Sequence, residues 1–110
     1  MYKQGEIVIV PFPFSDLSSI KQRPVLVLSK NTDNKKTEDI ITCGITSNVK
    51  DSKYSVLFDN DSLIEGKIPK TSKVKVDKLF TISQDIVKKR VARLNKETFE
   101  KVKSEFVSLV

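Results

Sequence analysis

Five short apolar runs rich in β-branched residues fill much of the first 79 residues, with polar or turn-forming residues between them. Residues of this kind favour strands. Strands that follow one another without helices between them are typical of a small antiparallel barrel. The predicted strands cover residues 6–10, 24–29, 39–46, 54–58 and 71–79.

Prolines mark the limits of the first two predicted strands. Pro11 and Pro13 follow the first run, so they either end it or place it at a sheet edge, because proline cannot donate a ladder hydrogen bond. The polar stretch 15–22 is predicted to be a loop, and Pro24 opens the second strand.

The predicted strand at residues 71–79 alternates between apolar and polar side chains. Val74 and Val76 face one side, and Lys73, Lys75 and Asp77 face the other. This period of two predicts a half-buried strand with a polar outer face.

The last part of the chain changes to a helical period. Asn95 is a good N-cap, and the residues after it place an apolar stripe on one side of an amphipathic helix. Acidic and basic residues alternate on its polar side, so packing on the barrel is favoured over membrane binding. Residues 86–94 fit a short helix, a strand, or both in turn. The stripe consists of Phe99, Val102, Phe106 and Leu109.

The composition restricts the chemistry of this chain. Its 110 residues are enough for one domain, expected to span residues 1–110, and they include no His. A catalytic mechanism or metal site that needs His is therefore excluded, and neither a metal site nor a cofactor is expected. Cys43 is the only cysteine, which excludes an intrachain disulfide and favours a reducing cytoplasm. No apolar run is long enough to cross a membrane.

The positive charge lies in the second part of the chain. Residues 1–66 carry 8 Lys/Arg and 9 Asp/Glu, a net charge of −1, whereas residues 67–110 carry 12 and 5, a net charge of +7. A basic region of this kind attracts polyanions, and nucleic acid is the first candidate. A lysine-rich surface that only improves solubility is the alternative.

Three local motifs occur in an order that resembles the MazF/PemK family, the RNA-cleaving toxins of bacterial type II toxin–antitoxin modules. They are residues 5–14, residues 22–29 (Gln-Arg-Pro followed by an apolar strand), and residues 45–47 followed by 71–82. The resemblance implies an SH3-like antiparallel β-barrel with a C-terminal helix, assembled as a homodimer. It also implies metal-independent cleavage of single-stranded RNA, in which the 2′-hydroxyl attacks the adjacent phosphate. The implied partners are an acidic antitoxin and, through the antitoxin complex only, operator DNA.

The resemblance assigns catalytic roles to Arg23, Thr46 and Asp77. A guanidinium can bind a phosphate with two donors and stabilise its growing charge, and a hydroxyl at a strand end can donate to a phosphate oxygen. Structural alternatives are an Arg23 ion pair with Asp16 or Glu6, a turn at Thr46, and an Asp77 carboxylate that only neutralises neighbouring lysines. The expected RNA-binding residues are Phe14, Lys21, Ser47, Lys73 and Lys75.

Two other functions compete with the toxin. The loop at residues 15–22 lacks the Gly and Glu that relatives often carry, which suggests an inactive relative that binds nucleic acid or has a regulatory role. An SH3-like adaptor that binds peptides is the other alternative. Peptide grooves of that type are lined by aromatic residues, and this chain has only 7% aromatic residues and no Trp.

Overall fold

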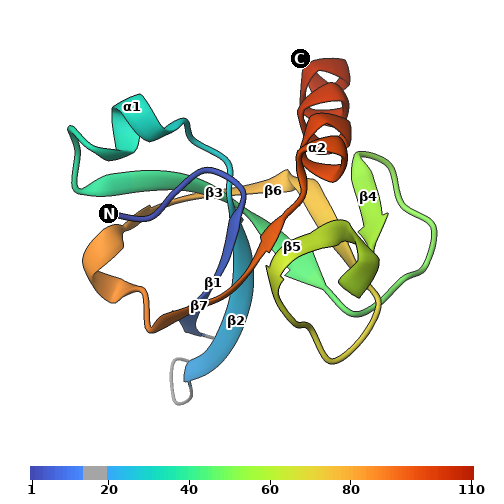
Figure 1. The fold of residues 1–110 in the computed structure, drawn as a ribbon, viewed down its shortest axis with the longest axis horizontal. Helices are drawn as coiled ribbons and strands as arrows, with labels where there is room; N and C mark the ends of the chain where they lie inside the picture. Colours follow the sequence, from blue (N-terminus) through green and yellow to red (C-terminus); the bar gives the residue numbers. More distant parts are fainter. Residues whose placement is uncertain (14–19) are drawn as a thin grey trace.

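The computed structural model describes residues 1–13 and 20–110. The described residues form a curled, seven-stranded sheet in the order β4-β6-β3-β2-β1-β7-β5, with every pair antiparallel (Figure 1). The prediction of a mainly β chain with a C-terminal helix is confirmed. The strands are β1 (Glu6–Pro13), β2 (Ile20–Val27), β3 (Asp39–Thr46), β4 (Ser55–Phe58), β5 (Leu63–Gly66), β6 (Ser72–Ser83) and β7 (Lys89–Leu94). The α-helices are α1 (Asn31–Asn34) and α2 (Lys96–Leu109), and 3₁₀ helices span η1 (Asn60–Ser62) and η2 (Gln84–Ile86).

Each face of the central strands packs into its own apolar core. Ile7 pairs with Leu26, and both side chains are fully buried in the core that α2 covers. The next pair, Val8 and Val25, is buried in a second core on the opposite face. Because successive side chains of a strand point to opposite faces, near-continuous apolar strands such as β1 and β2 require a sheet that curls around both cores.

The helix α2 begins and packs as its sequence predicts. The Asn95 side chain accepts a hydrogen bond of 2.8 Å from the Thr98 amide, which caps the first turn. Phe99 and Val102 are buried in the first core, and the helix contacts β4 and β6. Among the described residues, no helix is long and apolar enough to cross a membrane.

Strands β1 and β2 are longer than the sequence predicts. β2 begins at Ile20, within the predicted loop, and β1 continues through Pro13. β7 pairs with β1 only as far as Ile9. Pro11 and Pro13, which have no amide hydrogen, are therefore not needed as hydrogen-bond donors to β7. Pro24 likewise lies just before Val25, where the pairing of β2 with β3 begins. The prolines therefore neither end β1 nor make it an edge strand as predicted, since β1 lies between β2 and β7 and only its proline segment extends beyond the pairing with β7.

The ambiguous segment 86–94 forms a 3₁₀ turn and a strand in succession, since η2 ends at Ile86 and β7 begins at Lys89. The short elements α1 and β5 were not expected. β5 ends at Gly66, whose φ of +79° favours glycine.

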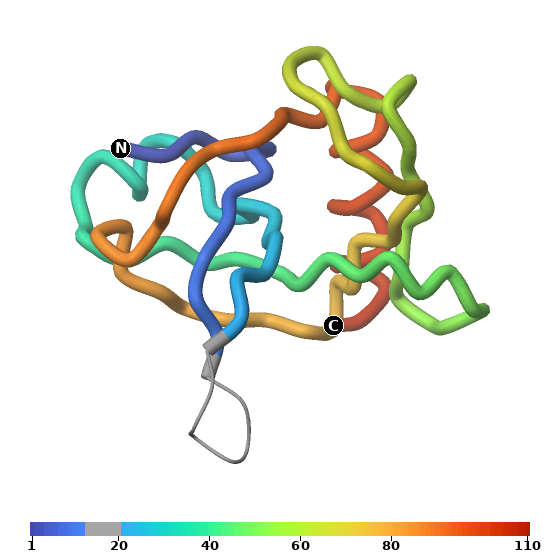
Figure 2. Tube along the Cα trace, turned by 90° about the horizontal axis from the view of Figure 1, so that it is seen from below, coloured from blue at the N-terminus to red at the C-terminus, as the bar shows by residue number. Residues whose placement is uncertain are grey.

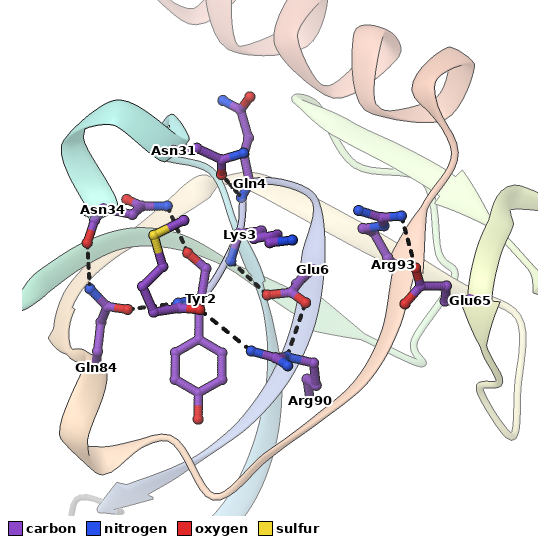
Figure 3. Close-up of polar contacts among 11 residues, drawn as sticks. Tyr2, Lys3, Gln4, Glu6, Asn31, Asn34, Glu65, Gln84, Arg90 and Arg93 are labelled. Atoms are coloured by element: carbon purple, nitrogen blue, oxygen red, sulfur yellow. Dashed lines mark hydrogen bonds and ion pairs between the residues drawn. The ribbon is translucent and has the colours of Figure 1, made fainter.

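A polar network joins the N-terminus to α1 and η2 (Figure 3). The Gln84 side chain accepts a hydrogen bond of 2.8 Å from the Tyr2 amide and donates one of 2.9 Å to the Asn34 carbonyl. Glu6, only 5% exposed, forms an ion pair of 3.0 Å with Arg90. Figure 2 shows the N-terminus and the cyan α1 segment together at one side of the molecule, away from the C-terminal helix. The network fixes this side of the sheet.

Candidate functional site

A cavity of about 470 Å³ lies where β2 and β3 meet the bend of β6. Arg23 and Thr46, two of the three predicted catalytic residues, both line it. The cavity is also lined by Lys75 and by two lysines that sequence reasoning did not select, Lys50 and Lys78. The described lining residues thus include four cationic side chains and one carboxylate, that of Asp51, which makes the cavity suited to an anion.

Arg23 reaches this cavity from β2, one residue before Pro24. It pairs with Val10 of β1 and is solvent-exposed, so its backbone is held by the sheet while its side chain remains accessible. The proposed structural partner Glu6 is instead bound to Arg90, and Asp16 lies outside the described residues.

A bulge in β6 forms one wall of the cavity. Cys43 of β3 pairs with Leu79, but the next residue, Gly44, pairs with Lys75, so residues 76–78 are extra on β6. A β-carbon at Gly44 would lie 3.4 Å from the Lys78 β-carbon, so glycine lets the bulge approach β3 closely. The bulge therefore brings both Lys75 and Lys78 to the cavity.

Asp77, the third predicted catalytic residue, lies within this bulge. Its neighbour Val76 is fully buried, and the Val76 amide donates a 2.8 Å hydrogen bond to the Tyr54 carbonyl. Asp77 itself is exposed and is not among the residues that line the cavity. The structure thus places Arg23 and Thr46 in one cavity, whereas Asp77 lies in the bulge of β6 and does not line this cavity.

Thr46 ends β3 and is partly buried. Its hydroxyl oxygen accepts a hydrogen bond of 3.0 Å from the Asn48 amide, the local turn that its sequence suggests. A threonine hydroxyl also has one hydrogen to donate. The turn therefore orients Thr46 without using its donor.

Two phenylalanines form the aromatic side of the cavity. The rings of Phe12 and Phe80 lie 4.8 Å apart between centroids, tilted by 54°. The predicted RNA-binding aromatic residue, Phe14, lies outside the described residues. Phe80 could not be selected from the alternation of residues 71–79, because the bulge decides which β6 residues reach the cavity.

The remaining predicted RNA-binding residues have different surroundings. Lys75 lines the cavity, whereas the exposed Lys21 and Ser47 do not. Lys73 is only 8% exposed, and its ammonium donates a hydrogen bond of 2.7 Å to the Lys50 carbonyl. Lys73 lines a second cavity, of about 420 Å³, which shares Asp51 and Ser52 of the β3–β4 loop (residues 47–54) with the first cavity.

Burial raises the pKa of the Cys43 thiol to about 12, so this thiol is protonated at neutral pH. Within the part of the chain that the structure describes, no group of three or more His, Cys, Asp or Glu residues is placed to hold a metal ion. The groups available at the cavity are a guanidinium, ammonium groups, the hydroxyls of Thr46 and Ser52 and the carboxylate of Asp51.

Solved structures share this fold. One, described as an endoribonuclease in complex with its cognate antitoxin from a mycobacterial species, has a TM-score of 0.75 and 18% identity over 98% of this chain and 93% of that one. The Mycobacterium tuberculosis toxin MazF-mt6 has a TM-score of 0.74 and 19% identity over 94% and 93%. A MazE–MazF structure from Deinococcus radiodurans has a TM-score of 0.73 and 20% identity over 98% and 93%. These matches confirm the expected fold class.

No curated protein matched this chain. The model of one family, described as the PemK-like, MazF-like toxin of type II toxin–antitoxin systems, matches residues 3–110. This match covers nearly the whole chain, including every element that forms the cavity. The chain therefore belongs to the PemK-like, MazF-like toxin family.

Proposed function

We propose that this protein is a toxin that cleaves single-stranded RNA within the chain. The observation that carries the proposal is the presence of Arg23 and Thr46 in one cationic cavity. Family membership and the similarity in fold to proteins described as endoribonucleases support it.

The proposed reaction is a transfer within the RNA. The ribose 2′-oxygen forms a bond to the adjacent phosphorus while the bond from phosphorus to the 5′-oxygen breaks, leaving a 2′,3′-cyclic phosphate and a 5′-hydroxyl. Arg23 stabilises the charge that develops on the phosphate, and Thr46 donates to a non-bridging oxygen. The 2′-hydroxyl loses its proton to a base, and the leaving 5′-oxygen gains one. Arginine remains protonated, so Arg23 suits the stabilising or acid role rather than that of the base.

Asp77 is the candidate for the base. Its exposed carboxylate would have to reach the 2′-hydroxyl from the bulge beside the cavity. The Asp77→Asn variant decides this role. A base supplies about 10²–10⁴-fold in rate, whereas a carboxylate that only neutralises neighbouring lysines supplies far less.

The cavity also suits the rest of a single-stranded RNA segment. Lys75 and Lys78 provide point charges for phosphates, and the tilted rings of Phe12 and Phe80 offer an apolar face to a base. Lys21, Ser47 and Phe14 remain predicted contacts outside this cavity or outside the described residues.

We infer the partners of this protein from its family. We propose a homodimer that an acidic antitoxin inhibits, with operator DNA bound only through the antitoxin complex. A relative is described as an endoribonuclease in complex with its cognate antitoxin, which supports the antitoxin part. Action in the cytoplasm remains a prediction from the single cysteine.

The test is cleavage of a long single-stranded RNA in excess EDTA, followed by mapping of the cut ends. Arg23→Ala and Thr46→Ala should each lower the rate by about 10²–10³, the usual cost of losing one preorganised donor. Lys101→Ala and Thr81→Ala, which change exposed residues outside the cavity, are the matched controls. Full activity of a folded Arg23→Ala protein would contradict the assignment, and an obligatory divalent ion would contradict the reaction. Binding of RNA by the wild-type protein without cleavage would favour the inactive relative.

A further inference from the structure

Lys73 lies in the sheet directly beside the candidate site. It pairs with Thr46 of β3 on one side and with Leu57 of β4 on the other. Side chains of directly paired residues in an antiparallel sheet extend from the same face. Lys73 and Thr46 therefore occupy the same face, yet Lys73 is only 8% exposed.

The β3–β4 loop covers this lysine. The Lys73 ammonium donates to the Lys50 carbonyl, at 2.7 Å, in the middle of the loop. Among the described residues, Lys73 forms no ion pair with a carboxylate. A buried ammonium needs hydrogen-bond acceptors to offset its lost hydration. The Lys50 carbonyl supplies one such acceptor, and the ammonium in return supplies a donor to the loop.

The centre of the loop lies beside open space. Asp51 and Ser52 line both the 470 Å³ cavity and the 420 Å³ cavity, so open space adjoins this part of the loop in both cavities. Several of its other hydrogen bonds are local, such as those from the Asn48 amide to Thr46 and from the Lys50 amide to Asn48. The bond from Lys73 joins Lys50, at the centre of the loop, to β6, whereas Ser52 and Tyr54 near the end of the loop bond to Ser55 of β4 and to the Val76 amide of β6.

We propose that Lys73 is a positioning residue, which holds the β3–β4 loop in the shape that binds RNA. This inference rests on the proposed function, and it replaces the expected direct contact between Lys73 and a phosphate. The loop supplies Asn48, Lys50 and Asp51 to the candidate cavity. Lys73 therefore acts on RNA through the loop, whereas Lys75, two residues along the same strand, acts through its own charge.

The salt dependence of RNA binding separates these two roles. An RNA with 2′-O-methyl groups throughout, which cannot be cleaved by 2′-hydroxyl attack, is titrated at several salt concentrations. Lys73→Met should weaken binding about tenfold, as the loss of one charge-assisted hydrogen bond predicts. It should leave the slope of log K against log salt unchanged, since no phosphate contact is lost. Lys75→Met, the matched control, should reduce that slope by about 0.7, the value for one phosphate contact with a single strand.

A second measurement does not depend on RNA. Trypsin cleaves after lysine, and the β3–β4 loop contains Lys50 and Lys53. Cleavage at these two sites should be several times faster in Lys73→Met than in the wild type or in Lys75→Met. If the Met variant does not fold, Lys73→Gln replaces it, because its amide is too short to reach the same carbonyl.

Two results would overturn the proposal. The first is a Lys73→Met protein with normal resistance to trypsin and a slope reduced as much as in Lys75→Met, which would establish a direct phosphate contact. The second is unchanged trypsin cleavage with unchanged affinity. If the wild-type protein binds no RNA at all, the proposed function fails, while the trypsin rates still decide whether Lys73 holds the loop.

Discussion

The reactivity of the Cys43 thiol measures whether the first core is intact, because this thiol is fully buried there at the centre of β3. Burial raises its pKa to about 12, and alkylation requires the thiolate. We expect iodoacetamide at pH 8 to modify the folded protein far more slowly than the protein in urea, with mass spectrometry as the readout. Comparable rates in the two states would contradict the buried position.

The same pKa predicts how stability depends on pH. The folded state keeps the Cys43 proton up to a pH of about 12, whereas the unfolded thiol, with its ordinary pKa of 9.0, loses it earlier. The unfolded state therefore binds fewer protons between these values, and the free energy of unfolding should fall as the pH rises from about 9. Urea titrations of the wild type and of Cys43→Ala measure this, because the variant should lack this part of the decline.

At the scale of elements, Gly66 controls how β5 joins β7. Its φ is +79°, and an added β-carbon would lie 2.0 Å from the Val91 carbonyl oxygen, so backbone must move. Gly66→Ala should lower the free energy of unfolding by about 1–3 kcal/mol for the strained backbone alone, and by more once the clash is added. Gly5→Ala is the matched control, since its φ is +89° but its nearest contact would be 3.8 Å away. Equal losses of stability in urea would contradict the clash.

Apolar patterning predicted most of the long strands but not their register. The alternation of Val74 and Val76 breaks at Asp77 and Lys78, two polar residues in succession, but this break gives neither the length of the three-residue bulge nor the residue of β3 that faces it. The bulge depends on Gly44, a residue of another strand. The sequence motifs selected Arg23 and Thr46 without knowledge of the register. Lys78 and Phe80 were not selected, because only the folded β6 shows that they line the cavity.

Other differences also arise from partners that are distant in sequence. Lys21, Gln22 and Arg23 of β2 are polar and become part of a strand because β1 pairs with them. Lys73 has the pattern of an exposed lysine, but the β3–β4 loop buries it. Burial by a loop leaves no local signal in the sequence of the residue that is covered.

At the scale of the whole molecule, the charge imbalance has a structural location. The segment 67–110, with its net charge of +7, contains β6, β7 and α2. Of these elements, β6 brings Lys75 and Lys78 to the candidate cavity. The basic part of the sequence thus contributes directly to the predicted RNA site, and the rest of it adds a longer-range attraction for anions.

An acidic antitoxin segment should therefore compete with RNA for this surface. Apolar side chains of the segment can also dock on exposed apolar residues beside the site, such as Val49 and the 57% exposed Leu57 of the second cavity. The expected result is displacement of labelled, 2′-O-methylated RNA by the peptide encoded next to the toxin, weakened but not abolished by salt. A scrambled peptide of the same composition is the control, and it should displace RNA only at low salt, because it retains the charge but not the order of apolar residues. If the native peptide binds while the RNA stays bound, occlusion of the site is wrong, and inhibition must act through a change in the toxin's conformation.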